Sequence, residues 1–185
     1  WHPEGARFRT RYREDTLRAI HAVKGQWLYD EILRIEDPAY LEDQFLGLVL
    51  RHQPLEGRTV LDFGCGCGSS SILLARRGAR VRGVELMPRL RDAARLRVRD
   101  EGLEDRIQLV DTQDMTALPF APGSFDLVSM NAVVEHVRVE ERGPILRHLW
   151  SLLAADGLLV ITETPNRLWP WDGHTTRLPF VPWMP

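Results

Sequence analysis

The middle of this sequence contains a glycine-rich turn and, after it, a carboxylate. Their spacing is suited to binding a ligand. Gly64, Gly66 and Gly68 alternate within TVLDFGCGCGSSSILLA, residues 59–75. Glycine has no Cβ and adopts left-handed backbone angles, so a ligand can approach the main chain closely at such a turn. Glu85 follows about twenty residues later, a spacing that lets a carboxylate accept hydrogen bonds from both hydroxyls of a ribose. The pattern therefore predicts a ligand with a nucleoside part.

Polar residues after the next two expected strands point to the same site. Asp114 lies in the loop DTQDMTALPF, where its carboxylate can accept a hydrogen bond from an exocyclic amine while Met115 lies along a flat base. Asn131 stands at the carboxyl end of the following strand, and His136 comes shortly after it on the same rim. With His174 in the C-terminal tail, His136 is a candidate general base, since imidazole exchanges protons near neutral pH.

The elements that must position these residues alternate between strand and helix. Short apolar runs bounded by turn residues predict buried strands, and longer periodic stretches predict helices between them. The expected strands are 60–63, 80–85, 107–110, 125–130 and 158–162. This order predicts an α/β fold, a doubly wound, Rossmann-like parallel sheet with right-handed crossovers.

Local signals predict where some helices begin and end. The serines 69–71 offer cap oxygens to the helix after the first strand, and Gly143-Pro144 predicts the start of the last helix. Asp156-Gly157 predicts a turn between that helix and the fifth strand. Near the N-terminus, residues 15–35 have a helical apolar period, broken near Gly25, and Asp37-Pro38 predicts the start of a second helix.

These signals predict three regions: an N-terminal arm with helices at 1–57, a ligand-binding α/β core at 58–163, and a tail at 164–185. The tail is rich in proline and tryptophan and leaves from the carboxyl end of a strand. We expect it to form a lid or a substrate wall.

Composition narrows the class of protein. The chain has 185 residues, of which 44% are hydrophobic, which is enough for one substantial core. Its formal charge of -2 gives no electrostatic reason to expect nucleic acid binding. No stretch is apolar for long enough to span a bilayer and no signal peptide opens the sequence, so we expect a soluble cytoplasmic protein without integral membrane association.

The two cysteines lie inside the glycine turn. Cys65 and Cys67 are alternate residues of a tight loop, which places them poorly for a disulfide, and two ligands are too few for a metal site. We therefore expect no metal and interpret both as small side chains that fill a cramped turn.

Taken together, the motifs resemble the class I S-adenosylmethionine-dependent methyltransferases. The turn VLDFGCGCG, the acid Glu85, the loop DMTALPF and the segment SFDLVSMNAVVEHV carry the resemblance, over roughly residues 58–164. The likeness is to the small-molecule branch that includes quinone-biosynthesis and natural-product enzymes. It implies S-adenosyl-L-methionine as cofactor, S-adenosyl-L-homocysteine as product, and methyl transfer to an oxygen, carbon or nitrogen atom of a small molecule. The aromatic tail favours a flat or lipophilic acceptor, and an oligomer is possible.

The resemblance also assigns roles to residues. Asp62, Gly64, Cys65 and Gly66 surround the methionine part of the cofactor, Glu85 holds the ribose hydroxyls, Leu86 lies against the adenine, Asp114 and Met115 form the adenine-binding loop, and the backbone of Asn131 faces the methionine amino group. The family's seven-strand sheet continues past the fifth strand into an antiparallel pair, which this sequence lacks. We therefore expect the natural polypeptide to continue beyond Pro185.

Two other functions stay open. A nicotinamide dehydrogenase also uses a glycine turn and an acid, but its G-x-G-x-x-G fingerprint would need glycine where this chain has Ser69. A catalytically silent S-adenosylmethionine-binding or scaffold protein would share the whole binding pattern.

Overall fold

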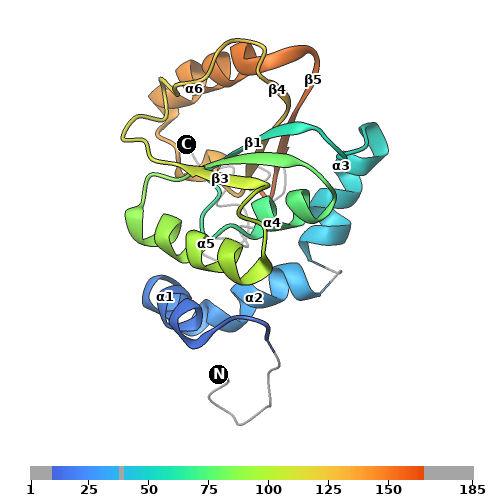
Figure 1. The fold of residues 1–185 in the computed structure, drawn as a ribbon. Coiled ribbons are helices and arrows are strands. Elements are labelled where there is room, and N and C mark those ends of the chain that lie inside the picture. Colours follow the sequence, from blue (N-terminus) through green and yellow to red (C-terminus); the bar gives the residue numbers. More distant parts are fainter. Residues whose placement is uncertain (1–9, 38–39, 165–185) are drawn as a thin grey trace, which may run out of the picture.

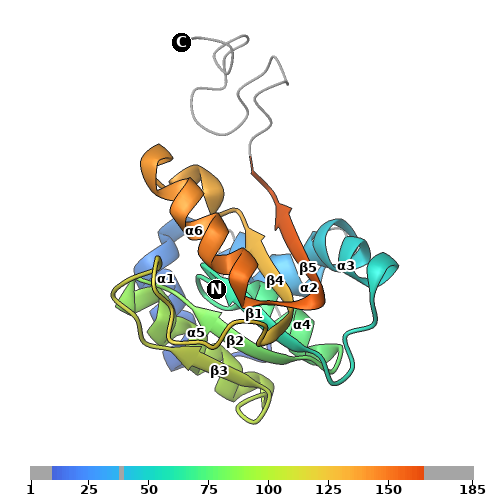
Figure 2. The ribbon, with the colours of Figure 1, turned by 90° about the horizontal axis from the view of Figure 1, so that it is seen from above.

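A parallel sheet forms the centre of the computed structural model, which describes residues 10–37 and 40–164 (Figure 1). Its strands are β1 (Thr59–Phe63), β2 (Arg80–Val84), β3 (Ile107–Val110), β4 (Phe125–Asn131) and β5 (Leu153–Thr162). Their order is β3-β2-β1-β4-β5, and all four neighbouring pairs are parallel. Figure 2 shows β3 and β5 at opposite edges. The predicted α/β fold with a parallel sheet is confirmed.

Helices cover both faces of this sheet. On one face lie α4 (Ser69–Arg76) and α5 (Pro88–Glu101), and α2 (Leu28–Glu36) and α1 (Glu14–Lys24) pack against them from outside (Figure 1). On the other face lies α6 (Val139–Leu152). The shorter elements are the 3₁₀ helices η1 (Gly25–Trp27) and η3 (Val134–His136), the π-helix η2 (Glu42–Leu46) and α3 (Gly47–His52).

The strands separate two apolar cores. Successive side chains of a strand point to opposite faces of the sheet. Val60 and Val81 accordingly belong to the core beneath α1, α2, α4 and α5, whereas Leu61 and Val128 belong to the core beneath α6. All four side chains are fully buried. Because both faces are covered, these strands read as continuous apolar runs in the sequence.

The N-terminal helices follow the predicted pattern with one gap in the description. Helix α1 ends at Gly25, whose φ of +54° is a conformation that favours glycine, and α2 continues after η1. The predicted break is confirmed. Pro38 lies outside the described residues, so the predicted helix start there stays a prediction. The chain after it forms η2 and α3.

Two predicted boundaries near the C-terminal strand are wrong. Helix α6 begins at Val139 and contains Pro144, rather than starting at Gly143-Pro144. Strand β5 begins at Leu153, before the expected turn at Asp156-Gly157. The chain does bulge there, because Phe125 pairs with Leu153 whereas Leu127 pairs with Leu158. The turn residues thus form an irregularity inside the strand.

The strand order creates a crevice at one end of the sheet. From β1 the chain passes to β2 on one side, and β4 lies on the other side of β1. The connections therefore diverge at the carboxyl ends of β1 and β4, which is where open α/β sheets bind ligands. In the described residues the sheet stops at β5 on the β4 side. The tail, residues 165–185, lies outside them.

Candidate functional site

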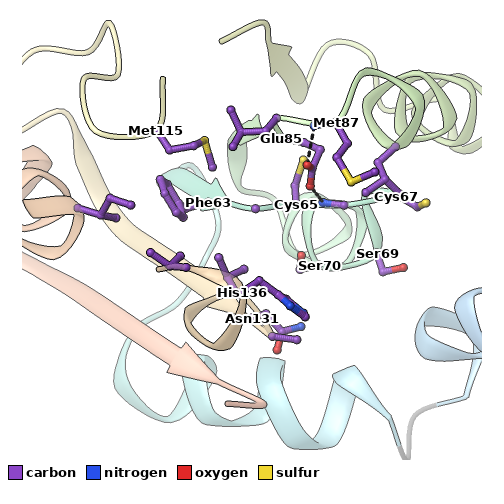
Figure 3. A pocket seen from close by; sticks show the side chains of 18 of the residues that line it. Phe63, Cys65, Cys67, Ser69, Ser70, Glu85, Met87, Met115, Asn131 and His136 are labelled. Carbon is purple, nitrogen blue, oxygen red and sulfur yellow. Dashed lines mark hydrogen bonds between the residues drawn. The ribbon is translucent and has the colours of Figure 1, made fainter. Parts of the chain in front are cut away.

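A cavity of about 640 Å³ lies at the carboxyl end of the sheet, beside the point where the connections diverge (Figure 3). Its walls come from the glycine turn after β1, the end of β2, the loop after β3, the end of β4 with η3, and parts of α1, α2 and α6. Elements far apart in the sequence therefore meet around one space, and most of the predicted ligand-binding residues lie around it.

The glycine turn borders the cavity with its backbone. Gly64, Gly66 and Gly68 have φ angles of +76°, +55° and +84°, which L side chains rarely adopt. A Cβ on Gly64 would also come within 2.6 Å of Cγ2 of Val133. A Cβ on Gly66 would meet no described heavy atom within 4 Å, so its backbone faces open space. The turn needs glycine for two reasons: the backbone angles at all three positions, and close packing at Gly64.

Glu85 follows β2 and holds the glycine turn in place. Its Oε2 accepts a hydrogen bond from the backbone N–H of Gly66 at 3.1 Å, and its Oε1 accepts one from the N–H of Met87 at 2.9 Å (Figure 3). Glu85 also lines the cavity. A carboxylate has about four lone-pair sites, so these two bonds leave capacity for the ribose hydroxyls that the sequence predicts as its partners. That role stays a prediction.

The residues expected on the adenine side line the cavity together. Leu86, which is 44% exposed, Asp114 and Met115 all border it. The Oδ1 atom of Asp114 accepts hydrogen bonds from the N–H and the hydroxyl of Thr116, at 2.7 and 2.6 Å. The hydroxyl bond is the main reason that the pKa of Asp114 lies below its usual value. Asp114 is therefore a carboxylate at neutral pH and can accept a bond from an amine.

Asn131 and His136 lie on a different wall from Glu85 and Met87 (Figure 3). The Oδ1 atom of Asn131, at the end of β4, accepts a hydrogen bond from the hydroxyl of Thr162 at 2.7 Å. His136 ends η3, and both residues line the cavity. His174, the other candidate base, lies outside the described residues.

Asp62 lies behind the turn and is not among the described residues that line the cavity. It is 1% exposed and accepts hydrogen bonds from the hydroxyls of Ser70, Ser71 and Ser129 at 2.7, 2.6 and 2.9 Å. Burial raises its pKa, and the three hydroxyl bonds oppose that rise. Its predicted contact with a cofactor stays untested, whereas its support of the turn is direct.

The predicted capping role of the serines is wrong. Helix α4 has the left-handed Gly68 as its N-cap, without a side-chain cap bond. Ser70 and Ser71 donate to Asp62, and the hydroxyl of Ser69 donates to Glu31 at 2.6 Å. The serines already lie inside the helix, and their hydroxyls donate to buried carboxylates, tertiary contacts that no local pattern shows.

The sequence profile of the methyltransferase domain family matches residues 61–161, which is more than half of the chain. The matched stretch runs from β1 to β5 and includes the glycine turn, Glu85 and the loop of Asp114. The chain belongs to this family. It is a class I S-adenosylmethionine-dependent methyltransferase domain, as the sequence motifs predict.

Curated relatives are similar to this methyltransferase domain. The methyltransferase GfsG of Streptomyces halstedii is 38% identical over 108 residues, which are 58% of this chain and 38% of GfsG. A ubiquinone biosynthesis O-methyltransferase of Xanthomonas euvesicatoria pv. vesicatoria (strain 85-10) is 38% identical over 113 residues, 61% of this chain and 45% of the relative. The chain thus spans less than half the length of these two relatives.

Solved structures share the fold. The geranyl diphosphate C-methyltransferase of Streptomyces coelicolor A3(2), solved with Mg²⁺, geranyl diphosphate and S-adenosyl-L-homocysteine, aligns with a TM-score of 0.58 at 24% identity. The alignment covers 72% of this chain and 49% of that protein. At this identity the likeness concerns the fold alone.

The N-terminal helices supply site residues of the methyltransferase domain that the sequence reasoning missed. Lys24 of α1 and Glu31 and Arg34 of α2 line the cavity. Lys24 pairs with Glu31, with 3.2 Å between Nζ and Oε2, and Arg34 pairs with Glu163 at the end of β5. Glu31 was the available signal, because it interrupts the buried apolar face of α2 between Leu28 and Ile32.

Arg97 of α5 anchors these helices to the methyltransferase core. Its side chain is fully buried and donates to Oε1 of Glu31, to the hydroxyl of Ser69 and to the carbonyl of Cys67, each at 2.9 Å. Its guanidinium also lies over the ring of Tyr12, 5.1 Å from the ring centroid. Burial alone would raise the pKa of Glu31, but Arg97 and Lys24 reverse the effect and lower it. Glu31 is therefore a buried carboxylate held by cations.

The two thiols are buried in the turn and free of each other. Burial raises the pKa of Cys67 to about 12, and burial together with the charges of Asp62 and Glu85 raises that of Cys65. Both are therefore neutral thiols at physiological pH.

The described ranges, 10–37 and 40–164, contain no group of three or more His, Cys, Asp or Glu side chains that could hold a metal ion. None of their helices is long and apolar enough to cross a membrane.

Proposed function

We propose that this chain binds S-adenosyl-L-methionine in the cavity and transfers its methyl group to a small-molecule acceptor. The observation that carries the proposal is that the glycine turn, Glu85 and the loop of Asp114 border one cavity in a chain of the methyltransferase domain family. None of these features alone is specific, but the proposed ligand needs all three.

The residues present fit this cofactor. The open backbone of Gly66 admits the methionine part, Glu85 suits the ribose hydroxyls, and the exposed side chain of Leu86 offers an apolar surface to the adenine. The charges agree with a cationic ligand. Of the described residues that line the cavity, the acids are Glu31, Glu85, Asp114 and Glu141, and the bases other than His136 are Lys24 and Arg34.

Much of the catalytic work of such a site is positioning. The bound cofactor supplies an electrophilic methyl group on a positively charged sulfur. The chain's residues would hold the acceptor in line with that group and exclude water, and correct placement alone is worth several kcal/mol of a barrier, about 7–11 in favourable cases. The walls that would do so are the glycine turn, which follows β1, and η3, which follows β4.

A hydroxyl acceptor also needs a base. We propose that His136 removes the acceptor's proton, because it lines the cavity and ends η3 on the wall opposite Glu85 (Figure 3). His174 is the second candidate, and an amine acceptor bound in its neutral form would need neither.

The wall toward α6 supports an apolar acceptor. Val133, Val137 and Ile145 line this side of the cavity, and Phe63 lines it at the end of β1. An aromatic or otherwise lipophilic small molecule would cover these side chains, and burial of apolar surface contributes about 25 cal/mol per Å². The formal charge of -2 gives no electrostatic reason to propose a nucleic acid as acceptor.

The test is formation of S-adenosyl-L-homocysteine. Purified protein is incubated with S-adenosyl-L-methionine and a panel of phenols, quinols, enols and amines, and the demethylated cofactor and the methylated acceptor are measured by mass spectrometry. We expect both products in equal amounts with at least one lipophilic acceptor. Cofactor binding without either product across the panel would support the alternative, a catalytically silent binding protein.

A further inference from the structure

Asp114, in the loop that also carries Met115, forms hydrogen bonds with its neighbours in that loop. Within it, Asp114 donates its N–H to Oγ1 of Thr112 at 3.1 Å and accepts the bonds from Thr116 described above. These bonds join residues two positions apart, and Asp114 and Thr116 are exposed. They shape the loop locally, but they do not fix its position against the cavity. That task falls to contacts with other elements.

His148 of α6 provides one such contact. Its Nε2 atom accepts a hydrogen bond from the backbone N–H of Leu118 at 3.0 Å. The side chain of Leu118 is 5% exposed and belongs to the core beneath α6. Further along, Gly123 donates its N–H to the carbonyl of Ser151 at 3.0 Å. The loop is thus fastened to α6 at two points, and the His148 bond is the nearer of the two to Asp114 in the sequence. Before Asp114, Asp111 pairs with Arg91 and Arg95 of α5.

The position of His148 on its helix places it beside the cavity. Glu141, Ile145 and His148 are separated by four and three residues, so they lie on one side of α6. Glu141 and Ile145 line the cavity. In its protonated form, His148 attracts the carboxylate of Asp114 and lowers the pKa of that carboxyl. One face of α6 therefore forms a wall of the cavity and holds the loop that forms the adjacent wall.

The hydrogen bond from Leu118 depends on the protonation state of the His148 imidazole. A nitrogen that accepts a hydrogen bond carries no proton, so the neutral ring has its proton on Nδ1. A second proton, on Nε2, would turn the acceptor into a donor facing the Leu118 N–H. Among the described charged groups, Asp114 of the loop interacts with the ring, and Glu141 of α6 interacts in turn with Asp114 and pairs with Arg138.

We propose that His148 is a positioning residue for cofactor binding: its neutral imidazole fixes the loop of Asp114 and Met115 against the cavity by accepting the Leu118 N–H, and protonation removes that acceptor. The proposal rests on the proposed function, because it assigns that loop to the cofactor. His148 acts through the Leu118 backbone and touches neither cofactor nor acceptor. Loss of this acceptor on protonation would make cofactor affinity depend on pH, in addition to any dependence that comes from the residues lining the cavity.

The test compares two variants across pH. His148→Gln keeps an oxygen that can accept the Leu118 bond but cannot be protonated, whereas His148→Leu removes the acceptor. Titration calorimetry gives the Kd of S-adenosyl-L-homocysteine between about pH 5.5 and 8, where histidines titrate. At pH 8 we expect His148→Leu to bind about three- to tenfold more weakly than wild type, the effect of one lost hydrogen bond, and His148→Gln to match wild type.

The pH profiles separate His148 from His136, which lines the same cavity. We expect the affinity of wild type for S-adenosyl-L-homocysteine to fall from pH 8 to pH 5.5. In both variants the affinity should fall less over this range, because neither has an imidazole at position 148. His52→Leu is the control, since His52 is exposed at the end of α3 and should follow the wild-type profile. Equal Kd values for wild type and His148→Leu at pH 8, or profiles that coincide, would overturn the proposal.

A second readout does not need the cofactor. Hydrogen exchange of the Leu118 amide should be faster in His148→Leu than in wild type and nearly unchanged in His148→Gln. Equal exchange in all three proteins would show that His148 does not hold the loop, which also overturns the proposal. If wild type binds no S-adenosyl-L-homocysteine at any pH, the proposed function fails together with the cofactor role of His148, and the exchange data alone decide whether His148 holds the loop.

Discussion

The carboxylate of Glu85 and the backbone N–H of Gly66 are joined by a hydrogen bond of 3.1 Å, which connects the end of β2 to the turn after β1. The same side chain accepts the N–H of Met87 at 2.9 Å. Glu85 therefore has two functions in one place: it orders the turn, and it presents a carboxylate to the cavity.

Replacing Glu85 should consequently weaken cofactor binding. A charged hydrogen bond contributes about 1.5–3 kcal/mol, so we expect Glu85→Ala to bind S-adenosyl-L-methionine roughly tenfold to a hundredfold more weakly in calorimetry. Glu85→Gln keeps one acceptor oxygen and should lose less. Glu104→Ala, an exposed change after α5, serves as the control. If folded Glu85→Ala retains wild-type affinity, Glu85 does not hold the cofactor.

The buried pair of Arg97 and Glu31 should be critical for stability. Arg97→Met leaves the Glu31 carboxylate without its main partner, and removal of one member of a buried ion pair costs about 3–5 kcal/mol. Urea unfolding measures this cost. The double variant Arg97→Met/Glu31→Gln should be less destabilised than the sum of the single changes, because no buried charge is then left unpaired.

Arg95→Met is the matched control for Arg97. It lies on the same helix, but its side chain is 43% exposed and pairs with Asp92 and Asp111 at the surface. Surface pairs contribute about 0–1 kcal/mol, so this variant should unfold nearly as wild type does. An equally small effect of Arg97→Met would mean that the N-terminal helices do not depend on Arg97.

The two cysteines should react slowly with thiol reagents. The pKa of about 12 for Cys67 and the raised pKa of Cys65 leave almost no thiolate at pH 8, and the thiolate is the reactive form. Both side chains are also at most 5% exposed. Alkylation by iodoacetamide, followed by mass spectrometry, should be complete within minutes in urea-unfolded protein and at least a hundredfold slower in folded protein. Equal rates in the two states would contradict the structure.

His136 should affect turnover more than binding. If the acceptor is a hydroxyl, His136→Ala should lower kcat by roughly a hundredfold, the usual contribution of a general base, and leave the Kd of the cofactor nearly unchanged. The decline of the rate toward acid pH should disappear with the imidazole. A variant that keeps both its rate and that decline would return His136 to a structural role and make His174→Ala the next measurement.

The glycine turn and Glu85 were accessible to prediction because their signal is local. The strand, the alternating glycines and the later acid follow one another within a short stretch, and both requirements on glycine, free backbone angles and absence of a Cβ, are visible in the residue type. The strands were predictable for a similar reason, since burial on both faces leaves continuous apolar runs.

Residues whose partners are distant in the sequence were misread or missed. The serines 69–71 have the composition of a helix cap, and only the fold brings Asp62 and Glu31 within reach of their hydroxyls. Lys24 and Arg34 look like ordinary helix-surface residues until α1 and α2 are packed over the cavity. Pro144 is typical of a helix start, but α6 begins five residues earlier, at Val139, and accommodates the proline.

Calorimetric titration of the wild-type chain with S-adenosyl-L-methionine, S-adenosyl-L-homocysteine and NAD tests the central claim most directly. The glycine turn, Glu85 and Asp114 around one cavity predict that the first two ligands bind with Kd values in the micromolar range and that NAD does not bind. Binding of NAD without binding of either S-adenosyl compound would contradict the assignment of this cavity.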